Sequence, residues 1–447
     1  MFHSDIRKST LNDNRSGVAI RALVSGVAGA TLALTGCASE LDPGDVTEPA
    51  AEITLDHRAA APPDWEAEGF SRERGISLAE ARRRLAWQVR APRLSDRAAS
   101  DLGDRFGGVW IDVQDGDRIK VGIAGTAGLD KAAVVRRAAD AVGLSEGYDF
   151  VEVRHSLATL ERANAWLGAQ IAKVNHGASA TLTAGLRTDL NALQLEAPID
   201  GALTDAQRDL VTAAQARFGD MIVVGTYRGR PTARGCSYPY CDAPLRGGIR
   251  ITNSGQTCTG GFIARSKEDS VLYQFTAGHC ADVASDDWET EFTNGTSHVI
   301  GAVWNWEFGN GGGDMAILRI ANADGWDPKP WVYVTSGPDT TTNMTYEINS
   351  DDTSVVGMRI CTTGGVYGAS DCGYVTQIGM TTSYNGETLY NLGRGSYCGT
   401  GGDSGAPMYA SHVAYGLQVG RFTECDSFYQ GIQAAETAMN VNVLHAP

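Results

Sequence analysis

Three short motifs in the second half of this 447-residue chain carry side chains that can act together in nucleophilic catalysis. His279 follows an apolar run, Asp314 begins another, and Ser404 lies in the glycine-rich segment 401–407. A serine hydroxyl is a weak nucleophile at neutral pH, so it needs a base to take its proton, and the base needs a carboxylate to orient it. These three residue types therefore predict a Ser-His-Asp catalytic triad.

The order of the three motifs along the chain narrows this interpretation. It runs His279, Asp314, Ser404, whereas α/β-hydrolases and subtilisins place the same groups in other orders. Glycines around Ser404 allow successive backbone N–H groups to converge on one point, as an oxyanion hole requires. Each motif alone occurs by chance, but three of them in this order strongly indicate a hydrolase.

Composition divides the chain into two unlike halves. From Pro231 onward there are 10 basic and 22 acidic residues, and this part holds 31 of the 54 glycines and eight of the nine cysteines. The whole chain has a formal net charge of −16. Such an acidic surface repels phosphate backbones, so we expect no nucleic-acid partner.

The eight cysteines after Pro231 are an even set, which predicts four disulfides formed in an oxidising compartment. A metal site is the rival interpretation. It fails on spacing, because the sequence contains no C-x2-C pair and no Cys/His cluster typical of zinc. We therefore expect neither a metal nor any other cofactor.

The first 37 residues are typical of an export signal. Basic residues precede an uncharged stretch at 22–36, which is too short to span a bilayer comfortably. The stretch ends at Cys37 in a Leu-Thr-Gly-Cys motif that resembles a bacterial lipobox. An ordinary signal peptide cleaved a residue or two later is the alternative. We favour lipidation of Cys37, because it is left over from the even disulfide set, and we expect no other contact with a membrane.

The composition of residues 38–64 predicts a disordered tether, and residues 65–230 are predicted to form an α+β domain. Capping signals and periodicity predict helices near 77–89, 157–174 and 204–218, and alternating runs around an Asp-Gly turn predict a hairpin over 108–123. No catalytic signature occurs in this half. Its place between an export signal and a cysteine-rich half indicates a pro-domain, with an independent binding module as the alternative.

Residues 231–447 are typical of an all-β domain. Short β-branched runs separated by turn residues occur at 248–252, 271–275, 315–320 and 414–419, which indicates a barrel or a sandwich. Only the segment near 434–443 has a helical pattern.

The segment Thr-Ala-Gly-His-Cys at 276–280, together with Gly-Asp-Ser-Gly at 402–405, resembles the chymotrypsin-like serine proteases. Cys398, six residues before Ser404, and the segment 427–430 resemble their bacterial branch, the streptogrisins and alpha-lytic protease. The resemblance extends loosely to the pro-domain of that branch. It implies two six-stranded antiparallel barrels with a C-terminal helix, preceded by an α+β pro-domain.

The resemblance also implies residue roles. His279 would be the general base, Asp314 its orienting carboxylate and Ser404 the nucleophile, with the amides of Gly402 and Ser404 as the oxyanion hole. It further implies the disulfides Cys258–Cys280, Cys361–Cys372, Cys398–Cys425 and, as a short extra bridge, Cys236–Cys241. One departure is Ala406, where the family usually has glycine; a methyl group there would crowd the backbone if φ were positive.

The substrate pocket is less well defined. By the same resemblance, Ser396, Val419 and Gly420 would line it. Ser396 stands where a trypsin carries Asp, so specificity for Arg or Lys is not indicated. No histidine occurs in 414–421, which argues against specificity for Glu. We therefore expect a neutral, apolar or aromatic residue before the cleaved bond.

These observations predict a secreted, monomeric serine endopeptidase that acts on protein or peptide substrates. It would be made as a zymogen that its own catalytic domain cuts between about residues 225 and 245, because the basic, flexible join there is open to proteolysis. Two alternatives remain. A surface-anchored lipoprotein would use the protease fold as a binding module, and an esterase would use the same nucleophile on small esters.

Overall fold

The computed structural model describes residues 64–447 with the exception of 126–127, 177, 179, 200, 228–243, 282–286, 293–294, 310, 322–325 and 335–343. The expected export signal, Cys37, the tether and the Cys236–Cys241 bridge lie outside the described residues. We call residues 64–227 the N-terminal half and residues 244–447 the C-terminal half; both belong to one compact unit, Thr54–Pro447.

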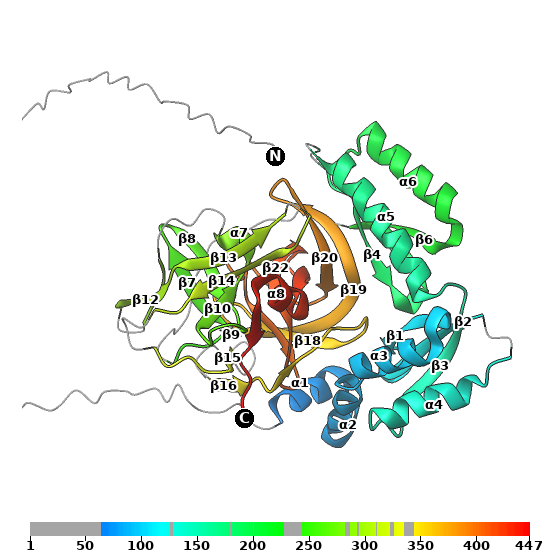
Figure 1. Cartoon of the computed structure of the whole chain (residues 1–447), viewed down its shortest axis with the longest axis horizontal. Helices are drawn as coiled ribbons and strands as arrows, with labels where there is room; N and C mark the ends of the chain where they lie inside the picture. Colours follow the sequence, from blue (N-terminus) through cyan, green and yellow to red (C-terminus); the bar gives the residue numbers. More distant parts are fainter. Residues whose placement is uncertain are drawn as a thin grey trace, which may run out of the picture. The chain divides into compact units, whose positions relative to one another are not determined.

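The N-terminal half is built from two groups of three strands with helices packed on them, and the second group belongs to a larger sheet (Figure 1). The first contains β1 (Phe106–Asp112), β2 (Arg118–Ala124) and β3 (Tyr148–Val153), with α1 (Trp65–Arg74), α2 (Leu78–Gln88), α3 (Ala91–Leu102) and α4 (Lys131–Ala141). The second contains β4 (Thr183–Arg187), β5 (Ala192–Pro198) and β6 (Ile222–Tyr227), with α5 (Leu157–Asn175) and α6 (Asp205–Phe218). Short 3-10 turns occupy Gly103–Arg105, Thr188–Leu190 and Gly219–Met221.

The local signals in the sequence account for these elements. Ser77 begins α2, where its hydroxyl accepts a hydrogen bond from the Glu80 amide at 3.2 Å. Thr204 begins α6, and its hydroxyl and the Gln207 side chain form a reciprocal capping box. The predicted hairpin is present, with Val109 opposite Val121 in antiparallel register. The helices predicted near 77–89, 157–174 and 204–218 are confirmed as α2, α5 and α6.

The C-terminal half is mostly β-structure. Its strands are β7 (Ile249–Asn253), β8 (Gln256–Gly260), β9 (Ile263–Ser266), β10 (Leu272–Thr276), β11 (Trp288–Glu291), β12 (Ser297–Gly301), β13 (Val303–Phe308), β14 (Asp314–Arg319), β15 (Trp331–Val334), β16 (Met344–Glu347), β17 (Ser350–Asp351), β18 (Arg359–Thr363), β19 (Ser370–Tyr384), β20 (Glu387–Gly395), β21 (Pro407–Ala410), β22 (Val413–Thr423), β23 (Asp426–Gly431) and β24 (Val441–Val443). Its helices are α7 (Gly278–Ala281) and α8 (Ile432–Met439).

Among the described residues, the later strands form a closed group of six, whereas the earlier strands form separate sheets in place of the expected six-stranded barrel. The described residues form a five-stranded sheet in the order β13-β14-β10-β9-β24 and a four-stranded sheet in the order β12-β11-β7-β8. The later strands follow the order β18-β21-β22-β23-β20-β19, and β18 also pairs with β19, which closes this group on itself. The expected terminal helix is present as α8, but it ends at Met439, after which β24 pairs with β9.

One sheet runs through both halves. Strand β4 pairs antiparallel with β19, with Leu186 opposite Ile378 and Ala184 opposite Thr381, so β4, β5 and β6 extend the edge of the β19–β20 hairpin (Figure 1). Because the backbone groups of an edge strand are unpaired until another strand adds to them, this pairing satisfies donors and acceptors of both halves.

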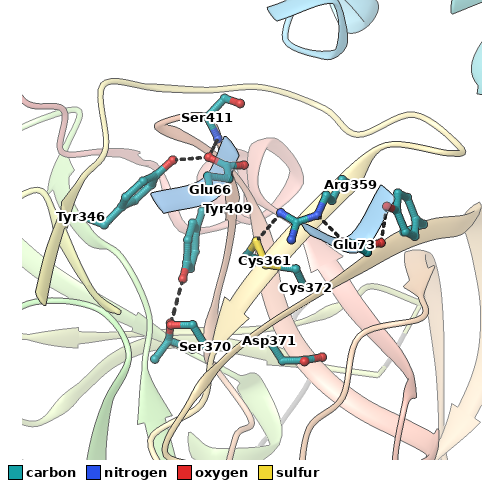
Figure 2. Close-up of a disulfide and its surroundings, with 12 residues drawn as sticks. Glu66, Glu73, Tyr346, Arg359, Cys361, Ser370, Asp371, Cys372, Tyr409 and Ser411 are labelled. Atoms are coloured by element: carbon teal, nitrogen blue, oxygen red, sulfur yellow. Dashed lines mark hydrogen bonds and ion pairs between the residues drawn. A yellow bond between two sulfur atoms is a disulfide. The ribbon is translucent and has the colours of Figure 1, made fainter. Parts of the chain in front are cut away.

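Helix α1 places two carboxylates on the C-terminal half (Figure 2). Glu66 accepts hydrogen bonds from the Tyr346 hydroxyl at 2.9 Å and from the Ser411 amide at 2.8 Å. Two turns further along the helix, Glu73 accepts from Arg359 Nε at 3.1 Å, beside the Cys361–Cys372 disulfide. Among the residues that the structure describes, no helix is both long and apolar enough to cross a membrane.

Candidate active site

His279 is placed by the short helix α7, which follows β10 directly. The preceding residue must be glycine, because a Cβ atom on Gly278 would lie 1.9 Å from the Glu307 carbonyl oxygen. This close approach holds α7 against the end of β13. The His279 ring therefore stays at a fixed position in front of β14, the strand that carries Asp314.

Asp314 begins β14 and is fully buried. Its Oδ2 lies 2.6 Å from His279 Nδ1, and its Oδ1 accepts a hydrogen bond from the His279 amide at 2.9 Å. The Asp314 amide in turn donates to Gln430 Oε1 at 3.2 Å. With both carboxylate oxygens engaged by one histidine, the carboxylate selects the imidazole tautomer that carries its proton on Nδ1.

Ser404 lies in the loop between β20 and β21, and its Oγ is 2.8 Å from His279 Nε2. The structure thus brings together the three side chains predicted from the sequence, although they are separated by 35 and 125 residues. Ser404 Oγ also lies 3.3 Å from the carbonyl oxygen of Val419 on β22. This geometry suits proton transfer from the hydroxyl to the imidazole.

Asp403 organises the loop that presents Ser404. It is buried, and its carboxylate accepts backbone hydrogen bonds from Val366 at 3.0 Å, Tyr367 at 2.9 Å and Thr400 at 2.6 Å. Burial raises the pKa of Asp403 to about 6, although the three amide donors oppose the shift. The sequence motif contained this residue, but its role in fixing the loop is visible only in the structure.

The loop conformation requires glycine close to Ser404. Gly402 has φ +92° and Gly405 has φ +90°, and a Cβ on Gly405 would lie 2.4 Å from the Thr259 carbonyl oxygen. Within the described residues, the amides of Gly402 and Ser404 donate no hydrogen bond. They are therefore available to a ligand.

Ala406, the departure from the family pattern, fits without strain. Its φ is not positive, and its methyl group is completely buried. Its amide donates to the Asp403 carbonyl at 2.9 Å, and its carbonyl accepts from Gln418 at 2.8 Å. The methyl group therefore does not force the backbone around Ser404 into an unfavourable conformation.

The three expected pocket residues lie in different environments. Val419 and Gly420 are on β22, directly after the strand residues that bond to the serine loop. Ser396 is exposed, and its hydroxyl accepts a hydrogen bond from the Tyr374 amide at 3.0 Å. The next residue, Tyr397, is buried and donates to Gln418 Oε1 at 2.5 Å.

Aromatic rings that the sequence did not single out flank His279. Tyr384, near the end of β19, is 5.1 Å from the His279 ring centre, and Phe308 of β13 is 5.8 Å from it. Burial, together with the nearby charge of Asp314, raises the pKa of Tyr384 above its ordinary value, so the phenol stays neutral. No local motif marks these rings, because they reach the site from distant strands.

Within the described residues, three disulfides link segments of the C-terminal half. They join Cys258 to Cys280, Cys361 to Cys372 and Cys398 to Cys425, as expected. The first anchors α7 to β8, and the third joins the serine loop to the turn between β22 and β23. Within the described residues, no group of three or more His, Cys, Asp or Glu side chains is arranged to hold a metal ion.

Comparison with known proteins decides the family. Over 201 residues the chain is 30% identical to glutamyl endopeptidase 2 of Streptomyces griseus, covering 98% of that protein and 44% of this chain. The chain belongs to the chymotrypsin-like serine proteases, in their bacterial branch. It is also 25% identical to streptogrisin-C of Streptomyces griseus over 435 residues, which is 96% of this chain and 81% of that protein. The second alignment includes the N-terminal half.

A solved structure of a glutamic acid specific serine protease, described as using a histidine triad in substrate binding, is 28% identical. It aligns over 45% of this chain and 100% of its own length, with a TM-score of 0.39. No family model matches the chain. As a member of this family, the chain is a serine protease that acts on proteins or peptides.

Proposed function

We propose that the C-terminal half hydrolyses peptide bonds through His279, Asp314 and Ser404 and a covalent acyl-enzyme intermediate. The observation that carries the proposal is the continuous hydrogen-bonded row from Asp314 through His279 to Ser404, at 2.6 and 2.8 Å. A binding module has no need of this row, which makes the lipoprotein alternative the weaker one.

In the first step, Ser404 Oγ attacks the substrate carbonyl carbon while its proton passes to His279 Nε2. The imidazolium that forms is stabilised by Asp314, which stays ionised. The new C–O bond places negative charge on the carbonyl oxygen, and the free amides of Gly402 and Ser404 would donate to it. His279 then gives its proton to the leaving amine as the C–N bond breaks. Water, activated by the same histidine, hydrolyses the ester.

Labelling with a fluorophosphonate tests the proposal against the binding alternative. The probe phosphonylates a serine only where a neighbouring base activates it, so we expect one label per chain, on Ser404, after the protein has matured. Hydrolysis of casein, compared with short-chain esters, then separates a protease from an esterase. A matured protein that neither takes the label nor cleaves casein would contradict the proposal.

The N-terminal half is proposed to be a pro-domain that covers the protease until it is cut away. Supporting this, β4 extends the β19–β20 hairpin, and the Tyr227 ring at the end of β6 lies 4.8 Å from that of Phe422 on β22. Tyr227 also belongs to the buried apolar cluster that contains Val419, whose carbonyl contacts Ser404. The last described residue of the N-terminal half, Tyr227, therefore lies beside β22, the strand that carries the expected substrate pocket.

Export by the first 37 residues, with or without lipidation of Cys37, and cleavage between about residues 225 and 245 complete the proposal. Supporting export, the three disulfides are typical of proteins that fold in an oxidising compartment. N-terminal sequencing of the mature species locates the cleavage point. We expect the mature protease to be a monomer that retains its disulfides.

For primary specificity, we expect a neutral apolar or aromatic residue before the cleaved bond. The ring of Phe428 lies where a Gly420 Cβ would point, 2.7 Å away, so an apolar ring fills the space beside Gly420. Peptide nitroanilides ending in Phe, Leu, Ala, Arg, Lys or Glu measure this preference through kcat/KM. The highest value is expected for Phe or Leu, and a preference for Arg, Lys or Glu would contradict the assignment.

A further inference from the structure

A carboxylate-binding site lies on the C-terminal half, away from the catalytic side chains. Its two donors are Arg394 on β20 and Gln377 on β19, which stand opposite each other in antiparallel register. With the N-terminal half in place, both are almost completely buried, at 7% and 2% exposure. A buried guanidinium and a buried amide on adjacent strands form a site for an anion, because each must find an acceptor.

In the full chain the N-terminal half fills this site. Glu196 of β5 places one oxygen, Oε2, on both donors: it accepts from Arg394 Nη1 and, at 3.4 Å, from Gln377 Nε2. Glu196 is itself only 4% exposed. It belongs to the segment that the proposed maturation removes, so the mature protease would keep both donors and lose the acceptor.

The guanidinium keeps its position without Glu196. Asp426 of β23 accepts from Arg394 Nε at 2.7 Å and from Nη2 at 2.6 Å, and the guanidinium carbon lies 4.7 Å from the centre of the Phe422 ring. These contacts all lie within the C-terminal half. Nη1 therefore remains oriented toward the place of the missing carboxylate, and a new carboxylate would bind with little loss of side-chain entropy.

The site lies near the C-terminal end of β22, the strand that carries the expected pocket residues Val419 and Gly420. Phe422 is three residues beyond Val419, whose carbonyl contacts Ser404, and a strand rises by about 3.3 Å per residue, so the two are separated by about 10 Å. The rings of Tyr227, Phe422 and Phe428 form a continuous row, with centre distances of 4.8 and 5.1 Å. A peptide lying antiparallel to β22 would place a residue about four positions before the cleaved bond at Phe422.

We propose that Arg394 and Gln377 form a subsite of the mature protease for an acidic side chain, about four residues before the cleaved bond. The proposal rests on the proposed removal of the N-terminal half, and in the zymogen Glu196 occupies the subsite in place of the substrate. The chemical class it recognises is a carboxylate on an extended peptide.

Matched peptide pairs test the proposal. Fluorogenic peptides with one fixed apolar residue before the cleaved bond would carry either Glu or Gln at each of the third to sixth positions before that bond. The matured wild-type protease is expected to cleave the Glu peptide with about tenfold higher kcat/KM at one of these positions, which corresponds to about 1.4 kcal/mol. High salt should reduce the ratio, because the subsite is open to solvent once the N-terminal half has left.

Variants separate recognition from folding. Arg394→Gln is expected to bring the Glu/Gln ratio to about one. Since this variant leaves Asp426 without its partner, Gln377→Leu serves as a second variant that keeps the Arg394–Asp426 pair and reduces the ratio. Arg265→Gln, on an exposed part of β9, removes the same charge and should keep the ratio.

The outcomes distinguish this proposal from the one on which it rests. A matured protease that cleaves all the peptides with a ratio near one, or whose ratio survives in both variants, would overturn the subsite and show that Arg394 holds only the pro-domain. A chain that yields no matured, peptide-cleaving fragment would overturn the zymogen proposal and the subsite with it.

Discussion

Ser404→Ala is expected to abolish peptide hydrolysis. The variant loses the only atom that lies 2.8 Å from His279 Nε2 within the described residues and that can form the acyl ester. The remaining rate should exceed that of the uncatalysed reaction in water by about 10³–10⁴-fold, through the oxyanion hole and substrate binding alone. Turnover of the best nitroanilide substrate, normalised to the amount of folded protein, measures the loss.

The same variant tests self-processing. If the protease cuts its own join, Ser404→Ala should accumulate as the uncut chain, and added wild-type protease should cut it. Ser297→Ala, an exposed serine on β12, is the matched control and should mature normally. Substantial hydrolysis by purified Ser404→Ala, free of wild-type enzyme, would show that another residue is the nucleophile.

Expression of residues 236–447 without the N-terminal half is expected to yield little active protease, less than about a tenth of the full-chain yield of active sites, because non-local β pairings fold slowly. The lost contacts are specific, because β19 loses its partner strand β4. Arg359 also loses Gln88, whose Oε1 accepts from the Arg359 backbone N–H at 2.9 Å and whose Nε2 donates to the Arg359 carbonyl at 2.7 Å. Fluorophosphonate labelling of the soluble fraction counts the active sites.

Supplying residues 40–230 as a separate chain should restore the yield. A Glu66→Gln, Glu73→Gln variant of that chain should restore less, because it removes the charges that Tyr346, Ser411 and Arg359 contact. If residues 236–447 fold and cleave casein unaided, the N-terminal half is not a folding aid, and the binding-module alternative gains support.

The sequence predicted most of what depends on neighbours along the chain. Caps marked the starts of α2 and α6, an Asp-Gly turn marked the β1–β2 hairpin, and the three motifs carried His279, Asp314 and Ser404. These predictions are correct because a helix cap, a turn or a glycine-rich loop is determined by interactions within a few residues. The terminal helix was less well placed: it ends at Met439, because the pairing of β24 with β9 overrides the helical pattern that continued to residue 443.

The chemistry therefore follows from the amino-acid sequence alone, which shows the side chains that are present, their order and the kind of local element that carries each. The distant groups that support these side chains become apparent only in the folded protein. Gln430 reaches Asp314 across 116 residues, Glu196 reaches Arg394 across 198, and Gln88 reaches Arg359 across 271. No local pattern encodes such contacts, because they arise only when strands far apart in the chain pair and bury polar groups that must then find partners.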